Sequence, residues 1–225
     1  AQHHISSKPK SQANVPAYLI QGLNPAEIDS IVLGTGEEAV TLKRQKGRFV
    51  VVNKDNYPAD MEKINKLLIS CLDIQTTELY TDNKANHKAL GVTEEDARAV
   101  VKFFKADSSL LTGIVIGKAK SEGTGTFVRL VADDKVYVTL KAPWINKRAM
   151  NYINQQLIKI NNEDIQTVTV SSPNEVYTLN KENGDIILKD IPEGKKLKDD
   201  AAKRVFTALT SLRFNDVKKA IHLDE

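Results

Sequence analysis

The sequence predicts an α+β fold of repeated β-β-β-α units, with antiparallel sheets and helices packed on one face. Two observations predict it. Residues 24–53 and 161–190 align without a gap, and each segment holds three short apolar runs separated by turn residues. Such runs are typical of a β-meander, and their recurrence indicates an internal repeat. A stripe of apolar residues with helical spacing then follows each meander.

The apolar and turn positions of the two meanders coincide in this alignment. The matched pairs are Ile28 with Ile165, Ile31 with Val168, Leu33 with Val170, Leu42 with Leu179, and Phe49, Val50 and Val51 with Ile186, Ile187 and Leu188. Gly47 and Gly184 also match, and we expect a tight turn at each because glycine accepts a positive φ without steric cost. Each meander is therefore predicted to contain three strands.

The helix after each meander is predicted from its apolar stripe and from acidic residues at its start, which favour the positive end of the helix dipole. The first helix opens at residues 58–60 and carries Ile64, Leu67, Leu68, Cys71 and Leu72. The second follows Asp199 and Asp200 and carries Val205, Ala208, Leu209 and Leu212. With a longer second connection, Ile64 corresponds to Val205 and Cys71 to Leu212. Cys71 is thus predicted to be a core residue and not a reactive thiol.

Further β-structure is predicted between the two copies. Four strands are expected, at residues 98–105, 110–119, 126–132 and 135–142. A hairpin turn is expected at residues 133–134. Glycines in the region are expected to shape a hairpin loop, and these are Gly117, Gly123 and Gly125.

A further helix is predicted over roughly residues 145–157, because Met150, Ile153 and Leu157 then share one side. Three regions follow from these elements. Residues 1–17 are polar and rich in Ser, Lys and Pro, and are expected to be a flexible tether. Residues 18–158 are expected to form one α+β domain, and residues 159–225 a second β-β-β-α unit that is a partial repeat.

Composition excludes several classes of protein. The chain has 32 Lys and Arg against 29 Asp and Glu, and this net charge of +3 is no basic footprint for nucleic-acid binding. Its single cysteine excludes an internal disulfide and a multi-cysteine metal site, and none of its 4 histidines has metal-site spacing. No apolar run reaches the roughly 18–20 residues of a membrane span, so these residues are not expected to insert into a membrane.

No catalytic, cofactor-binding or metal-binding residue is predicted. The segment at 113–119 resembles a phosphate-binding loop, but it has too few residues between its glycines and no Ser or Thr after its lysine. A Ser nucleophile elbow is absent, and the adjacent acids at 94–96 fall in a solvated loop. The sequence therefore favours a protein that is not an enzyme, with a hydrolase assembled from scattered residues as a further alternative.

Trp144 is the residue singled out for an interface. It is the one tryptophan of the chain and follows Pro143 near the start of the predicted helix. Two placements are open for this side chain. It plugs an edge of the core, or it anchors an interface, a role in which tryptophan is enriched.

An ordered set of short motifs marks the front of the chain. LIQGLNPAEIDSIVL begins at Leu19, and Tyr57-Pro58-Ala59-Asp60 precedes the first predicted helix. ALGV, IGKA and FVRLVADDKVYV follow, at residues 89–92, 116–119 and 127–138. From residue 18 to 142 their order and spacing resemble a bacterial domain-of-unknown-function family with a YPAD motif, although Phe49 stands where that family often has Trp.

This resemblance implies a location more than an activity. Members of that family carry an N-terminal membrane anchor before an extracytoplasmic domain. They are often encoded beside ABC-type transporter components of the gliding-motility kind, and no catalytic residues are assigned to them. The chain begins at Ala1 without a Met, which we interpret as a processed end or a lost upstream anchor. An expression remnant on a cytoplasmic protein is the alternative.

The leading hypothesis is therefore an extracytoplasmic, membrane-tethered interaction domain that serves an ABC-type transporter or another envelope assembly. Its expected partners are membrane transporter components, and no cofactor is expected. A module that binds a small molecule or glycan between the two units is the alternative. The oligomeric state stays open.

Overall fold

The fold is that of a computed structural model, which describes residues 17–191, 193–194 and 196–220. The tether expected at 1–17 lies outside these residues, apart from Ala17. The chain divides into two compact units, which we call unit 1 (residues 17–153 with 218–220) and unit 2 (residues 154–217). The division falls at 153/154, a few residues before the expected one at 158/159.

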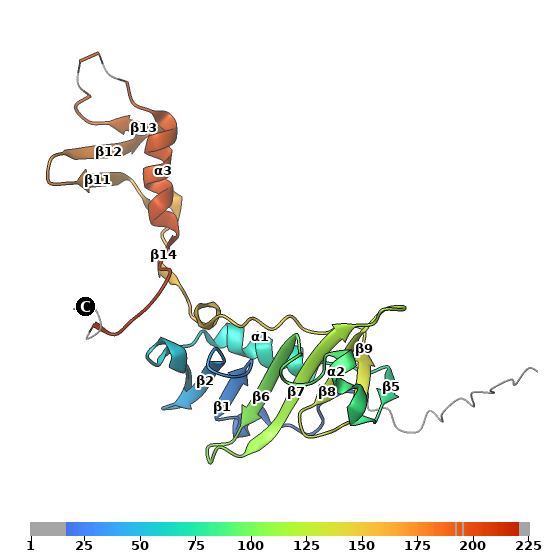
Figure 1. Cartoon of the computed structure of the whole chain (residues 1–225). Helices are drawn as coiled ribbons and strands as arrows, with labels where there is room; N and C mark the ends of the chain where they lie inside the picture. The colour runs from blue at the N-terminus through green and yellow to red at the C-terminus, as the bar shows by residue number, and fades with distance from the viewer. Residues whose placement is uncertain (1–16, 192, 195, 221–225) are drawn as a thin grey trace, which may run out of the picture. The chain divides into compact units, whose positions relative to one another are not determined.

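Unit 1 is built around a 9-stranded sheet with the order β4-β3-β2-β1-β6-β7-β8-β9-β5 (Figure 1). Every pairing in it is antiparallel. Its strands are β1 (Ser30–Leu33), β2 (Val40–Gln45), β3 (Arg48–Val51), β4 (Tyr57–Pro58), β5 (Glu78–Thr81), β6 (Ala99–Phe104), β7 (Leu110–Ala119), β8 (Thr126–Leu130) and β9 (Val136–Thr139). Four of them match the strands expected between 98 and 142.

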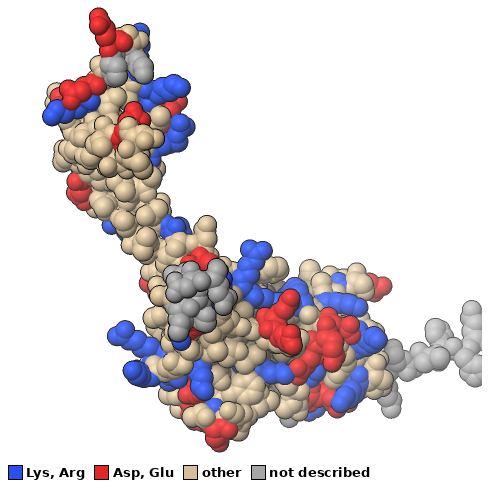
Figure 2. Space-filling view, turned by 60° about the vertical axis from the view of Figure 1, so that its left-hand side comes forward, with Lys and Arg blue, Asp and Glu red and all other residues tan. Residues whose placement is uncertain are grey.

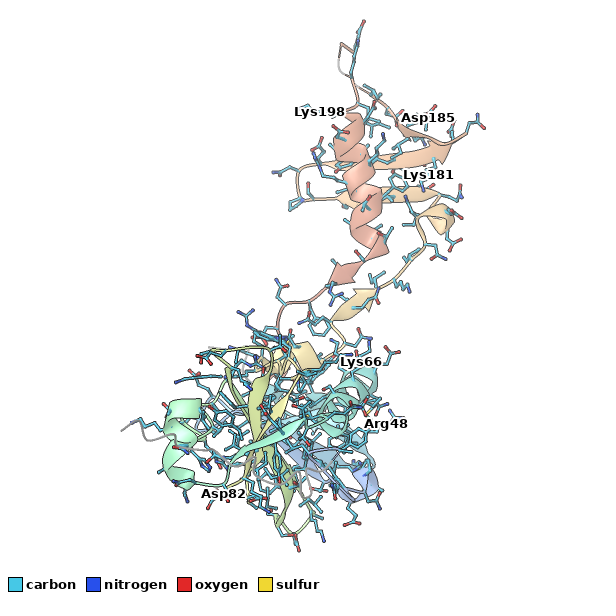
Figure 3. The ribbon with its side chains drawn as sticks, turned by 90° about the vertical axis from the view of Figure 1, so that its right-hand side faces the viewer. Arg48, Lys66, Asp82, Lys181, Asp185 and Lys198 are labelled. Carbon is cyan, nitrogen blue, oxygen red and sulfur yellow. The ribbon has the colours of Figure 1, made fainter. Side chains whose placement is uncertain are left out.

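Two α-helices belong to unit 1, α1 (Met61–Leu72) and α2 (His87–Leu90). Asp60 caps the N-terminus of α1, because its side chain accepts a hydrogen bond from the backbone N–H of Glu62 at 3.0 Å. The two helices lie on opposite sides of the sheet (Figures 1 and 3). The expectation that helices pack on one face therefore holds for α1 and is wrong for α2.

A second apolar cluster explains the position of α2. Val100 and Val115 pair across β6 and β7, and their side chains lie on the face opposite to that of Val101. Leu90 and Val92, at the end of α2, pack against this cluster. The helix is short, and nothing in its sequence spacing marks the buried face.

Gly117 has a structural role other than the expected one. It lies within β7, and a Cβ added to it would stand 2.5 Å from Val92 Cγ1. The glycine therefore allows the segment after α2 to approach the strand closely. Only Gly123 and Gly125 lie in the loop between β7 and β8, with φ of 78° and 131°.

Unit 2 is smaller. A 3-stranded antiparallel sheet, in the order β11-β12-β13, packs against one helix. Its elements are β10 (Gln156–Ile158), β11 (Thr167–Ser171), β12 (Val176–Glu182), β13 (Asp185–Leu188), α3 (Asp199–Thr210) and β14 (Leu212–Arg213). Strands β10 and β14 pair with each other. The remaining elements of the chain are short 3-10 helices at Pro25–Glu27, Val52–Lys54, Lys84–Asn86, Ala149–Tyr152 and Asn162–Asp164.

The two meanders have the same register. In unit 1 Leu42 pairs with Ile31 on one side and with Val51 on the other. In unit 2 Leu179 pairs with Val168 and with Leu188. Both hairpins turn on two residues with positive φ, at 46–47 and at 183–184. The protein is thus broadly α+β, with antiparallel sheets in both units.

The helix predicted over 145–157 is wrong. The segment forms a 3-10 turn at Ala149–Tyr152 and then enters β10, with Leu157 exposed. Asparagine side chains accept hydrogen bonds from nearby backbone, Asn146 from the N–H of Arg148 and Asn154 from that of Gln156. Such local bonds compete with helix formation.

Leu212 is also misplaced by the sequence prediction. Helix α3 ends at Thr210, and Leu212 lies in β14, which follows. Both α1 and α3 are 12 residues long, so alignment from their first residues pairs Ile64 with Ala202 and Cys71 with Leu209. The second connection is therefore shorter than we expected from the apolar pattern.

Candidate functional site

Trp144 lies in the segment that follows β9, and its side chain is 82% exposed. The first of its two open placements, a plug at the edge of the core, is therefore wrong. A tryptophan side chain exposed to this extent contributes little to folding, because the apolar area that it removes from water is small. The exposed ring is available for contact with a partner.

Neighbouring residues hold this segment against unit 1. Ile145, directly after Trp144, is buried, while the Trp144 side chain is exposed. The hydroxyl of Tyr152 donates to the carbonyl oxygen of Asn146 at 2.8 Å. Burial raises the pKa of Tyr152 to about 12, so this hydroxyl stays protonated and keeps its donor role. The ring of Trp144 is thus presented from a supported backbone.

Helix α1 fixes the far end of the same segment. The N–H of Asp60 donates to the carbonyl oxygen of Tyr152 at 2.8 Å. The Nζ of Lys63 donates to the carbonyl oxygen of Ile153 at 2.7 Å. Asp60 and Lys63 therefore hold the turn at Ala149–Tyr152, which follows Trp144 in the chain. The last residue of the YPAD motif thus helps to position the segment that carries Trp144.

Three cationic side chains line the same cavity as Trp144. Trp144 borders a shallow cavity of about 300 Å³ whose other lining residues are Arg98, Ala99, Ile145, Asn146, Lys147 and Arg148. Arg98, Lys147 and Arg148 are exposed. Among the described residues none of these three cations has an ion pair. We call Trp144 with Arg98, Lys147 and Arg148 the Trp144 surface.

The sign of the charge changes next to this surface. Lys147 also lines a second cavity, of about 220 Å³, together with Glu38, Glu94 and Glu95. Figure 2 shows that Lys and Arg side chains and Asp and Glu side chains both occur on the visible face of each unit. A partner that fits the Trp144 surface is therefore expected to combine an apolar contact with a local acidic group, because opposite charges across an interface favour association.

Another cavity of unit 1, with a volume of about 620 Å³, has a lining that does not include Trp144. It is lined by residues from the segment at 19–27 and from the ends of β7, β8 and β9, among them Gln21, Asn24, Glu27, Asp133 and Tyr137. Its mixture of polar and apolar groups suits a polar small molecule.

Cys71 and the histidines form no site of their own. Burial raises the pKa of the Cys71 thiol to about 12, so the thiol stays neutral and unreactive near neutral pH. His87 is buried, with Nε2 at 2.8 Å from the carbonyl oxygen of Asp134. His3, His4 and His222 lie outside the described residues. Within the described part of the chain, no three His, Cys, Asp or Glu side chains gather in a way that could hold a metal ion.

No helix in the described part of the chain has both the length and the apolar character needed to cross a bilayer.

A family model described as "Domain of unknown function (DUF4340)" matches residues 50–225. That region includes most of unit 1, the Trp144 surface and all of unit 2. A search of curated proteins and a search of solved structures found no match.

Proposed function

Since the chain belongs to the family described as Domain of unknown function (DUF4340), we propose its role from its surfaces: it is a protein-interaction domain that binds through the Trp144 surface. The observation that carries this proposal is the 82% exposure of Trp144 on a segment held by hydrogen bonds. Tryptophan and arginine, together with tyrosine, are enriched at energetically dominant interface positions.

The proposal includes an extracytoplasmic location, a membrane anchor upstream of Ala1 and an ABC-type transporter component as the partner. The resemblance of the YPAD segment and of the segments that follow it supports this part. Tyr57 and Pro58 form β4, and Asp60 caps α1, so the motif has a definite place at the junction of sheet and helix.

We also propose that the two meander-and-helix units are repeats of one β-β-β-α unit. Three features support it: the common register of the strands, the positive φ values at both hairpins, and helices of equal length after both meanders. A domain made of such units offers sheet edges and helix faces to partners without the need for an enclosed pocket.

The test is recovery of the partner from membranes of the source cell with the complete, tagged gene product. We expect a transporter component to copurify with the unaltered protein, and its yield to fall about tenfold with Trp144→Ala. Tyr80→Ala is the matched control, since Tyr80 is an aromatic residue of unit 1 that is also exposed.

Protease treatment of intact cells tests the location separately. Digestion of the domain from outside the cytoplasmic membrane is expected. Recovery of equal amounts of partner with both variants, or protection of the domain in cells whose outer layers are permeabilised, would contradict the proposal.

The cavity of about 620 Å³ favours a second candidate function, the binding of a polar small molecule. Asn24→Leu and Asp133→Leu would remove polar groups from this cavity. If a metabolite or glycan pool raises the melting temperature of the unaltered protein but not of these variants, the protein is a ligand-binding module.

A further inference from the structure

Strand β11 is at the edge of its sheet, and within the described residues no strand pairs with its outer side. Its inner side faces β12: the N–H of Lys181 donates to Gln166 O at 2.8 Å, and the N–H of Ser172 donates to Glu175 O at 2.8 Å. Backbone groups alternate in direction along an antiparallel strand. The N–H and C=O groups of Thr167, Thr169 and Ser171 therefore point away from the sheet.

The same edge is covered in unit 1. There β1 pairs with β6, with Ser30 opposite Phe104 and Val32 opposite Lys102. The N–H of Gly34 continues the pairing by donating to Val100 O at 2.8 Å. With the two meanders aligned in their common register, Ser30, Val32 and Gly34 correspond to Thr167, Thr169 and Ser171.

Burial also differs at corresponding positions of the two cores. In unit 1 four apolar side chains are buried, namely Leu33, Phe49, Val51 and Cys71. Their counterparts in unit 2 are only half-buried, namely Val170, Ile186, Leu188 and Leu209. The core of unit 2 thus leaves apolar area in contact with water, and part of that area lies on β11 itself.

Nothing on β11 protects this edge. Sheet edges are commonly blocked by lysine, proline, an inward-pointing charge or a β-bulge. The strand reads Thr-Val-Thr-Val-Ser, and its register with β12 is regular from Thr167 to Ser171. An edge of this kind is ready to accept another strand.

We propose that the outer edge of β11 binds an extended segment of a partner polypeptide as an antiparallel fourth strand. Strand β6 defines the pattern of that segment, because it places Phe103 opposite Ile31 and Val101 opposite Leu33. The partner strand accordingly presents large apolar side chains opposite Val168 and Val170, on the face that α3 covers. A second copy of β11 offers only valines at these places and covers less of the half-buried core. This site is separate from the Trp144 surface and does not depend on it.

The experiment uses the full chain, labelled with ¹⁵N, and a capped peptide of residues 98–105, RAVVKFFK. Amide hydrogen exchange is measured by NMR with and without the peptide. Exchange at Thr167, Thr169 and Ser171 is expected to slow by about tenfold or more at saturation, because each gains a hydrogen-bond partner. Exchange at Val168 and Val170, whose amides already face β12, is expected to change much less.

Two methylated peptides are the matched controls, and neither alters the folding of the protein. In β6 the N–H of Lys102 faces β1, whereas that of Val101 faces β7. N-methylation at Lys102 is therefore expected to abolish the protection of β11, and N-methylation at Val101 to preserve it. A peptide with Val101→Ser and Phe103→Ser tests the apolar pattern and is expected to lose most of its binding.

On the protein side, Thr169→Pro removes one outward N–H and is expected to prevent binding, while Thr169→Val retains that N–H and binding. Trp144→Ala is expected to bind the peptide unchanged, which separates this site from the proposed interaction surface. Unchanged exchange along β11 at saturating peptide would overturn the proposal. So would protection of β11 that rises with protein concentration in the absence of peptide, because a second copy would then be the occupant.

Discussion

The meanders of unit 1 and unit 2 share one register and end with different cores. In unit 1 the sheet continues past β1 into β6 and the strands beyond it, and Leu33 at this junction is wholly buried. In unit 2 the sheet stops at β11, and the counterpart Val170 is half-buried. The comparison teaches that a local strand pattern determines pairing within a hairpin, while the depth of the core depends on what is added at the edge.

The helices of the two units bury different side chains. Helix α1 buries Ile64, Leu67 and Cys71, whereas α3 buries Ala202 and Phe206. Counted from the helix start, Phe206 corresponds to the half-buried Leu68. One large aromatic side chain thus fills much of the space in the smaller unit, because aromatic residues bury more area than any aliphatic one.

The largest expected effect is that of a charge in either helix. Ile64→Asp is expected to lower the free energy of unfolding of unit 1 by about 5 kcal/mol, because no opposite charge or hydrogen bond offsets the desolvation of a buried carboxylate. Ala202→Asp in unit 2 is expected to cost less, because water reaches the edges of that core. Urea unfolding followed by residue-specific NMR measures both. Ile69→Asp, at an exposed position of α1, is the control. Equal costs for Ile64→Asp and Ala202→Asp would contradict the difference in burial between the two cores.

A matched pair of truncations compares the two cores at equivalent positions. Leu42 and Leu179 hold the central position of each meander, and both are buried. We expect Leu42→Ala to cost about 4 kcal/mol and Leu179→Ala about 2–3 kcal/mol, because a less enclosed site relaxes around the cavity. Amide exchange in β2 and β12 reports the two values separately. A larger cost at Leu179 would show that unit 2 has the tighter core.

Alkaline pH tests the depth of the unit 1 core. The folded pKa of Cys71 is about 12 against an ordinary 9.0, so between these pH values the unfolded chain binds fewer protons and stability falls as pH rises. The expected slope from this group is about 1.4 kcal/mol per pH unit. Cys71→Ala is expected to remove that slope, leaving the contribution of Tyr152, whose pKa is also raised to about 12. A slope unchanged by the substitution would contradict burial of the thiol.

The smallest expected effect is at a pair of cations. Arg44 lies 4.7 Å from the centroid of the Phe49 ring and donates from Nε to Ile28 O at 3.2 Å. Its counterpart Lys181 lies 5.1 Å from the Phe206 ring and donates to Asn162; Figure 3 shows it on β12. Each change to Met is expected to cost about 1 kcal/mol in its own unit. Thermal unfolding of both variants measures this, and an effect on the other unit would show coupling.

Much of the fold was predictable, and the reason is local. The three-strand pattern, the hairpins at 46–47 and 183–184, and the start of α1 at Asp60 all depend on residues close in sequence. The four strands between 98 and 142 follow from their alternation. The helix predicted at 145–157 was wrong because its apolar residues have a helical spacing while its asparagines bond to the local backbone.

The candidate site was predictable only as a residue type. The sequence indicated Trp144 but left its placement open between core and surface. The cations at 147 and 148 are its neighbours in sequence, so they could have been noticed. Arg98 could not, since β6 and the segment after β9 meet only in the folded protein.

By itself the sequence determined the residues of each hairpin, the registers within them and the cap of α1 at Asp60, because these depend on φ preferences, on the alternation of side chains and on hydrogen bonds between near neighbours. Tertiary structure alone decided that α2 lies on the second face of the sheet and that the segment after α2 packs closely against Gly117. It also decided that Trp144 faces water and that β11 is an edge strand. Each of those outcomes depends on which distant segments cover a surface, and burial is a property of all the neighbours together.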